Sequence, residues 1–251
     1  MAGDFELLKK RFIELAERSY SSGIFTFTDF LGLAELSALA ECGARLCGVG
    51  CECFGGAVGC ERVMARFGSP EELGYSADFP IVCIKAEPKN PKFADRFTHR
   101  DFLGAVLNLG IERDMLGDIA VIDNAGYIFS HEDIAPFIIS ELRRVKHTDV
   151  NVTAADAPCG ELYKTERRVI QVSGERLDAV IAKVFSLSRA DAQLCFNRRL
   201  VFASGREISN TSYAPKPDEV ISVRSFGRFI YRGVESLSRK GKLNAAVDLY
   251  V

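Results

Sequence analysis

Basic residues near the carboxyl end of this 251-residue sequence have the spacing of an anion-binding site. Ser188 and Arg189 stand at the expected start of a helix, where serine caps the first turn and backbone N–H groups lack partners. A phosphate bound there would meet the positive end of the helix and the guanidinium of Arg189. Arg176 stands just before a preceding helix. We therefore expect this region to bind a polyanion.

Two short helices must position these groups. The first has an apolar face, formed by Leu177, Val180, Ile181 and Val184. The second buries Ala192, Cys195 and Phe196 and ends near Arg198 and Arg199. Strands are expected at 200–202, near Ile208 and at 220–223, with a turn at 204–206. Together they predict a small sheet packed against two helices.

The distribution of charge favours the same partner. The net charge is −2, yet residues 1–163 carry 16 Lys and Arg against 25 Asp and Glu, whereas residues 164–242 carry 16 against 8. A basic end on an acidic body indicates polyanion binding, although a solvated face or local ion pairs are the alternative. The residues expected to contact the polyanion are Arg176, Ser188, Arg189, Arg198, Arg199, Arg206, Arg224, Arg228, Lys240 and Lys242.

Neither membrane insertion nor metal binding is expected. No apolar run approaches the roughly 20 residues that span a bilayer, and the first residues are charged, so we expect a cytoplasmic protein. Five of the eight cysteines cluster between Cys42 and Cys60, but without the Cys-x-x-Cys spacing of structural zinc sites. We expect free thiols, no metal and no cofactor.

The periodicity predicts an α+β protein with three parts. The N-terminal α/β region, residues 1–75, has expected helices at 4–19 and from Thr28 or Asp29 to Gly43, with strands at 46–54 and 61–67. The middle domain, residues 76–156, has a β-α-β-β-α-β order: strand 80–86, a helix from Thr98 to Gly110, strands 119–122 and 127–129, helix 130–144 and strand 150–152. The third part is residues 168–235, with a basic tail to 243.

The tripeptide His99-Arg100-Asp101 at the start of a helix allows three interpretations. Because Thr98 is a suitable cap and Asp101 lies in the first turn, a capping network is one. A second contact with the polyanion through Arg96, His99 and Arg100 is another, and acid–base chemistry is the least favoured. Phe54-Gly55-Gly56 lacks the spacing of a nucleotide-binding loop and is interpreted as a tight turn. We identify no catalytic residues.

The C-terminal pattern resembles the S-four domain, also called the alpha-L RNA-binding motif. The resemblance rests on Arg176-Leu177-Asp178, Ser188-Arg189, the strand at 200–202, the tight turn and the acidic turn before the last strand. It implies that two helices present basic side chains to structured RNA. The sequence departs from the pattern at Arg199, where glycine is usual, at Ala203-Ser204 in place of Val-Asn, and at Pro217 before Asp218.

Three further segments resemble bacterial YlmH-type proteins. They are Arg96 to Ala105 with Gly110 to Ile119, Phe54-Gly55-Gly56 with Glu61-Arg62, and Ser225 to Phe229 with Arg239 to Lys242. This resemblance implies a non-enzymatic factor that binds the rRNA of the large ribosomal subunit and tRNA during quality control of stalled nascent chains, with a link to cell division in some Gram-positive bacteria. An RNA-modifying enzyme is one alternative. A cell-division scaffold that binds a protein partner through the acidic N-terminal region is another.

Overall fold

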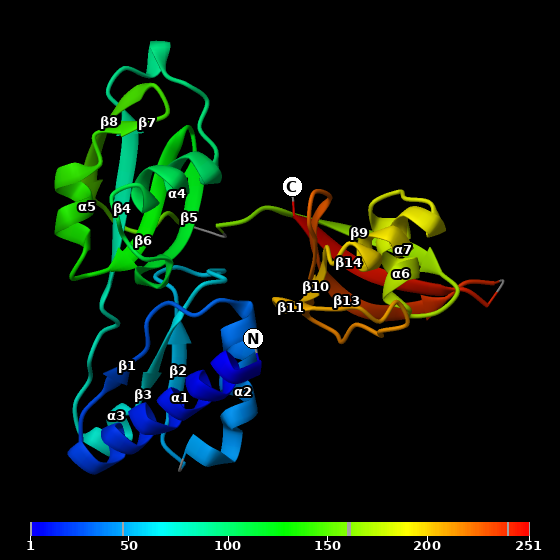
Figure 1. The fold of residues 1–251 in the computed structure, drawn as a ribbon, viewed down its shortest axis with the longest axis horizontal. Helices are drawn as coiled ribbons and strands as arrows, with labels where there is room; N and C mark the ends of the chain where they lie inside the picture. Colours follow the sequence, from blue (N-terminus) through cyan, green and yellow to red (C-terminus); the bar gives the residue numbers. More distant parts are fainter. Residues whose placement is uncertain (1, 47, 160–161, 240, 251) are drawn as a thin grey trace. The chain divides into compact units, whose positions relative to one another are not determined.

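A computed structural model describes residues 2–46, 48–159, 162–239 and 241–250 of the chain. The polypeptide forms two compact units, residues 1–162 and 163–251 (Figure 1). Both combine helices with antiparallel sheets, which confirms the predicted α+β class. None of the described helices is long and apolar enough to cross a lipid bilayer.

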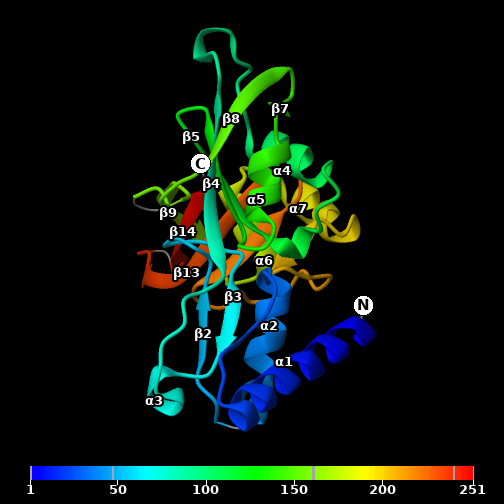
Figure 2. The ribbon, with the colours of Figure 1, turned by 90° about the vertical axis from the view of Figure 1, so that its left-hand side faces the viewer.

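The first part of unit 1 is a three-stranded antiparallel sheet in the order β1-β3-β2. Helices α1 and α2 cover one of its faces (Figure 2), and Phe12, Leu39 and Phe67 are buried between them. The elements are α1 (Ala2–Ser22), β1 (Thr26–Phe27), α2 (Leu33–Cys42), the 3-10 helix η1 (Gly43–Leu46), β2 (Cys51–Phe54), β3 (Met64–Phe67) and α3 (Pro70–Leu73).

The expected start of the second helix at Thr28 or Asp29 is wrong. The helix begins at Leu33, because the preceding residues extend the pairing of β1 with β3. The Thr28 N–H donates to the Ala65 carbonyl at 2.9 Å, and Leu31 forms an isolated bridge with Val63. A long-range sheet contact therefore overrides the local capping signal.

The second part of unit 1 is a five-stranded antiparallel sheet in the order β5-β6-β4-β8-β7. Figures 1 and 2 show α4 and α5 on the same face of it, where Phe102, Val106 and Ile138 enter one buried cluster. The elements are β4 (Ile81–Pro88), η2 (Pro91–Phe93), α4 (His99–Leu107), η3 (Arg113–Met115), β5 (Leu116–Ile122), β6 (Ala125–His131), α5 (Ala135–Glu141), β7 (Arg144–Val145) and β8 (Thr148–Ala154). The predicted β-α-β-β-α-β order is present, with β7 added.

The helix expected at 130–144 is shorter than predicted. Ser130 is fully buried in β6, where it pairs with Val82 of β4, and Arg144 pairs with Asp149 in the β7–β8 hairpin. The residues at both ends of the expected helix therefore belong to strands. Only the central turns, in α5, remain helical.

Gly126 in β6 has no room for a side chain, because a Cβ atom there would lie 2.6–2.7 Å from three atoms of the Phe102 ring. We expect Gly126→Ala to lower the free energy of unfolding by about 1–3 kcal/mol through overpacking. Hydrogen exchange of the β6 amides across a series of urea concentrations measures this change within unit 1. Gly104→Ala in α4 is the matched control, since nothing lies within 4 Å of its added Cβ; equal free energies of unfolding for the two variants would contradict the packing.

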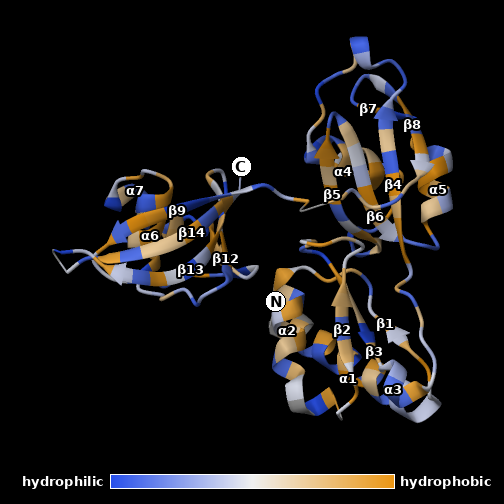
Figure 3. Ribbon diagram, turned by 180° about the vertical axis from the view of Figure 1, so that it is seen from behind, coloured by the Kyte–Doolittle hydropathy of each residue, from blue (hydrophilic) through white to orange (hydrophobic). Residues whose placement is uncertain are grey.

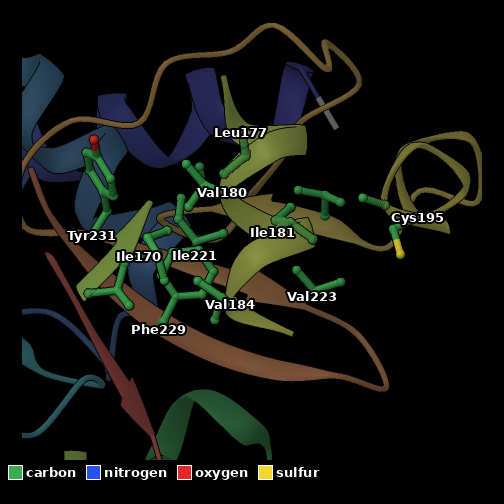
Figure 4. Close-up of a cluster of buried hydrophobic side chains, with 14 of the residues drawn as sticks. Ile170, Leu177, Val180, Ile181, Val184, Cys195, Ile221, Val223, Phe229 and Tyr231 are labelled. Carbon is green, nitrogen blue, oxygen red and sulfur yellow. The ribbon is translucent and has the colours of Figure 1, made fainter. Parts of the chain in front are cut away.

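Unit 2 is a six-stranded antiparallel sheet in the order β11-β10-β12-β13-β14-β9, with α6 and α7 packed on it. Figure 4 shows the cluster between them, which includes Leu177, Ile221 and Phe229. The elements are β9 (Thr165–Val172), α6 (Leu177–Val184), α7 (Arg189–Asn197), β10 (Val201–Ala203), β11 (Arg206–Glu207), β12 (Glu219–Val223), β13 (Gly227–Leu237) and β14 (Leu243–Tyr250).

The expected basic tail after residue 235 differs from the structure. β13 continues to Leu237 and β14 returns beside it, so that β14 lies between β13 and β9. Ala245 and Val247 of β14 are fully buried and belong to the core cluster of unit 2. The C-terminal segment is therefore a structural part of the sheet.

Candidate nucleic-acid interface

Helix α7 places Arg189 at its exposed first position. The Ser188 hydroxyl accepts a hydrogen bond from the Asp191 N–H at 3.1 Å and donates one to the Asp191 carboxylate at 2.6 Å. This cap fixes where the helix begins, while Ala192, Cys195 and Phe196 anchor its other face in the core. The predicted cap is confirmed, and Arg189 is exposed beside the positive end of the helix.

Arg176 and Arg189 act on the same buried carboxylate. Nε and Nη2 of Arg176 donate to Asp178 at 3.1 and 2.8 Å; Asp178 is fully buried, whereas the Arg176 side chain is 44% exposed. The hydrogen bonds from Arg176 lower the pKa of Asp178, and the positive charge of Arg189 lowers it further. The charges of Arg176 and Arg189 therefore both act on this carboxylate, and the three side chains together carry a net positive charge.

A second set of arginines gathers where α7 runs into β10. Arg198 and Arg199 are exposed at the end of α7, and Nε of Arg199 lies 3.1 Å from Glu207. Arg224 joins them through its N–H, which donates to the Leu200 carbonyl at 2.9 Å, and its guanidinium lies 4.5 Å from the centre of the Phe202 ring. Arg206 stands next to Glu207 in the β10–β11 hairpin.

The other predicted contacts are not brought to these helices. Arg228 is stacked on the rings of Tyr163 and Tyr250, at 5.0 and 4.2 Å from their centres. Lys242 lies in the β13–β14 hairpin, at the opposite end of β13 from Arg228. Since β13 has 11 residues, this separation is roughly 30 Å along the strand. Lys240 falls outside the described residues.

Unit 1 has a basic surface of its own, which we call the basic tip and define as residues 89–100 and 143–148. The Thr148 hydroxyl joins the two segments by donating to Asp95 at 2.9 Å. Nζ of Lys146 donates to the Arg96 carbonyl, also at 2.9 Å. Next to them, the Lys89 N–H donates at 3.0 Å to the carbonyl of Asp149, the residue that follows the second segment. This end of the sheet is largely hydrophilic in Figure 3.

The basic tip concentrates positive charge on an otherwise acidic unit. It carries seven Lys and Arg and one Asp, whereas the rest of residues 1–162 carries nine against 24 Asp and Glu. Phe93 projects from it with 78% of its surface exposed, and Nζ of Lys92 lies 5.6 Å from the centre of its ring. Exposed aromatic and cationic side chains together suit the bases and phosphates of a nucleic acid.

The predicted residues Arg96, His99 and Arg100 all lie exposed in this tip. The capping interpretation is confirmed for Asp101, whose carboxylate accepts from the N–H and hydroxyl of Thr98 at 2.7 and 2.6 Å. These bonds and Lys146 lower the pKa of Asp101 to about 2. Sequence reasoning missed the remaining basic side chains of the tip: Lys89, Lys92, Arg143, Arg144, Lys146 and His147.

Arg62 is a structural residue. Its side chain donates to the carbonyls of Leu116, Phe30 and Arg113 at 2.9, 2.8 and 3.2 Å, and so ties the N-terminal sheet to the middle sheet. Gly55 and Gly56 nearby form the predicted tight turn, in which Gly56 has a φ of +98° and presses against the Phe129 ring. The described residues contain no cluster of His, Cys, Asp and Glu that could hold a metal ion.

Comparison with known proteins places the basic tip within a known domain family. Residues 75–158 match the family model described as "Putative RNA-binding domain in YlmH". The middle domain is of the YlmH type. The resemblance to YlmH-type proteins expected from the sequence is thereby confirmed, and both segments of the basic tip belong to the YlmH-type domain.

One relative extends the similarity beyond the YlmH-type domain. Ribosome-associated protein quality control protein P2 of Bacillus subtilis (strain 168) is 28% identical over 232 residues, which cover 86% of this chain and 83% of that protein. The solved structure of cell division protein ylmH from Streptococcus pneumoniae superposes with a TM-score of 0.48 and 22% identity, over 61% of this chain and 91% of that one.

Proposed function

We propose that this chain is a non-catalytic RNA-binding factor that associates with the ribosome through rRNA and tRNA and acts on stalled nascent chains. The observation that carries the proposal is the exposed Arg189 at the Ser188-capped first position of α7, whose positive charge acts together with that of Arg176 on the buried Asp178. The YlmH-type domain and the similarity to a ribosome-associated quality control protein support it. The C-terminal unit is proposed to be the S-four type domain.

Two surfaces would share the RNA. The helix pair of unit 2 offers an exposed arginine at a helix start, where the fork of a guanidinium suits phosphate oxygens. The basic tip of unit 1 adds cations and the exposed ring of Phe93. A structured RNA that is contacted by both surfaces would gain affinity from the linkage of the two binding events.

Binding to ribosomes should weaken steeply with salt, because neutralised phosphates release counterions. If about four phosphates are neutralised, the affinity should fall roughly 100-fold between about 50 and 200 mM monovalent salt. Co-sedimentation of the full chain with purified ribosomes across this range measures the slope. A slope near zero would contradict the proposal.

The variant Arg96→Gln/Arg100→Gln separates the basic tip from unit 2. If both arginines contact phosphates, the slope of log affinity against log salt should become shallower by about two. The matched control is Arg11→Gln/Arg18→Gln on α1, which removes two exposed arginines elsewhere in unit 1. Equal changes in slope for the two variants would show that net charge, and not the tip, matters.

A further inference from the structure

The edge of β2 is open for strand pairing. β2 lies at the end of its sheet, next to β3 only, among the described strands. The Gly68 N–H donates to the Gly50 carbonyl at 2.8 Å, and the alternation of an antiparallel ladder then directs the backbone groups of Glu52 and Phe54 toward β3. The N–H and carbonyl groups of Cys51 and Cys53 therefore point away from the sheet.

A groove of about 530 Å³ runs beside this edge. Glu52 and Phe54 of β2 line it, which fits the alternation of side chains along a strand. Its apolar wall includes Phe79 and Phe129, and the ring centres of Phe54 and Phe79 are 5.6 Å apart. Gly56 also lines the groove, where a side chain would collide with the Phe129 ring at 2.4 Å.

The charged groups of the groove favour a cationic occupant. Its one basic side chain, Arg66, is already engaged by Glu52 and by the Ala77 carbonyl, and its guanidinium lies 5.1 Å from the centre of the Phe79 ring. Asp78 and Asp156 are exposed and have no ion-pair partner among the described residues. Carboxylates beside aromatic rings attract a guanidinium or ammonium group and repel phosphate.

We propose that the β2 edge and this groove form a docking site for an extended basic segment of a protein partner. The segment adds a strand beside β2, using the outward backbone groups of Cys51 and Cys53, and places an arginine or lysine in the groove near Asp78 and Asp156. The acidic residues of unit 1 outside the basic tip attract such a basic segment electrostatically. This site is independent of the proposed RNA-binding surfaces.

Binding of a fluorescein-labelled decapeptide of alternating arginine and valine to the full chain tests the site by fluorescence anisotropy. We expect Asp78→Asn/Asp156→Asn to weaken binding about tenfold, or about 1.4 kcal/mol. Cys53→Pro removes an outward N–H without touching the β3 ladder and should weaken binding by a similar factor. Glu14→Gln/Glu17→Gln on α1, with the same change of charge, should have less than about a twofold effect.

Three outcomes would overturn the proposal. Equal losses for the α1 variant and the groove variant would show diffuse attraction between polyanion and polycation. If Cys53→Pro does not fold, the same peptide with alternate N-methylated amides replaces it, and unchanged affinity for that peptide would exclude strand addition. Equal binding of a glutamate–valine peptide would exclude the charge assignment. Arg189→Glu should leave peptide binding unchanged, so failure of this site and failure of the RNA proposal are distinguishable.

Discussion

Replacement of Arg189 by glutamate is expected to weaken binding of structured RNA and of ribosomes by about 2 kcal/mol, or roughly 30-fold. The wild-type side chain is exposed at the first position of α7, beside the N–H groups that the Ser188 cap leaves facing solvent. A carboxylate at this point would repel phosphate and occupy the positive end of the helix. Electrophoretic mobility shift with an RNA hairpin and co-sedimentation with ribosomes both measure the loss.

Arg167→Glu is the matched control in the same unit. Arg167 alternates with Ile170 and Val172, which enter the core, and therefore lies on the sheet face away from α6 and α7. The charge change is identical, and we expect a loss of less than about threefold from net charge alone. A comparable loss from both variants would show that Arg189 holds no special position. Wild-type affinity of the Arg189 variant would remove the main support for the proposed function.

The second large effect is expected on stability. Asp178→Ala should lower the free energy of unfolding of unit 2 by about 2 kcal/mol, because it removes two charged hydrogen bonds from Arg176 to a buried carboxylate. Water partly screens this pair, since the Arg176 side chain is 44% exposed. The Ala179 N–H also loses one of its two acceptors, the Asp178 carboxylate at 2.8 Å, and keeps the Arg176 carbonyl at 3.0 Å. Hydrogen exchange of the α6 amides is the suitable measurement, since a single melting curve would mix the two units.

This effect should depend on pH in a defined direction. The folded pKa of Asp178 is lowered, so its stabilising contribution is complete above the unfolded value near pH 3.9 and is lost as the pH falls through the folded pKa. The difference between wild type and Asp178→Ala should therefore be constant near neutrality and shrink below about pH 4. Arg176→Lys keeps the charge but loses the bidentate fork. Its free energy of unfolding should therefore lie between those of the wild type and Asp178→Ala. A difference that grows in acid would contradict the assignment.

The parts of the fold that local signals control could be predicted. The first helix, the Thr98 and Ser188 caps and the turn between β5 and β6 all depend on residues within a few positions of one another. Asp123 and Asn124 in that turn both have positive φ values, of 50° and 63°, which asparagine and aspartate tolerate better than most residues. Composition and spacing are sufficient for such features.

Errors arose where distant segments pair. Thr28 looked like a helix cap, yet its N–H is taken by Ala65, 37 positions later. The basic tip combines segments more than 40 positions apart, so only its first half, with Arg96, His99 and Arg100, was suggested by the sequence. A count of charge in short windows would have identified the second half at Arg143, Arg144 and Lys146.

Two residues that depart from the S-four pattern, which the sequence resembles, have a left-handed backbone. Arg199 has a φ of +58° and Ser204 a φ of +44°, in the left-handed region where glycine and asparagine are favoured. These are positions at which the S-four pattern usually has glycine and asparagine. The left-handed conformation of Arg199 therefore costs on the order of 1 kcal/mol relative to glycine. The arginine places a guanidinium at the end of α7.

The pairing of β14 with β9 has a consequence for how unit 2 folds. The pair joins Thr165 to Tyr250 and Val172 to Leu243, so every helix and remaining strand of the unit lies inside the loop that it closes. Closing so long a loop costs entropy before its contacts repay it, and chains with many such distant contacts fold slowly. We therefore expect α6 and α7 to reach their final arrangement late in folding, in one cooperative step with the pairing of β14.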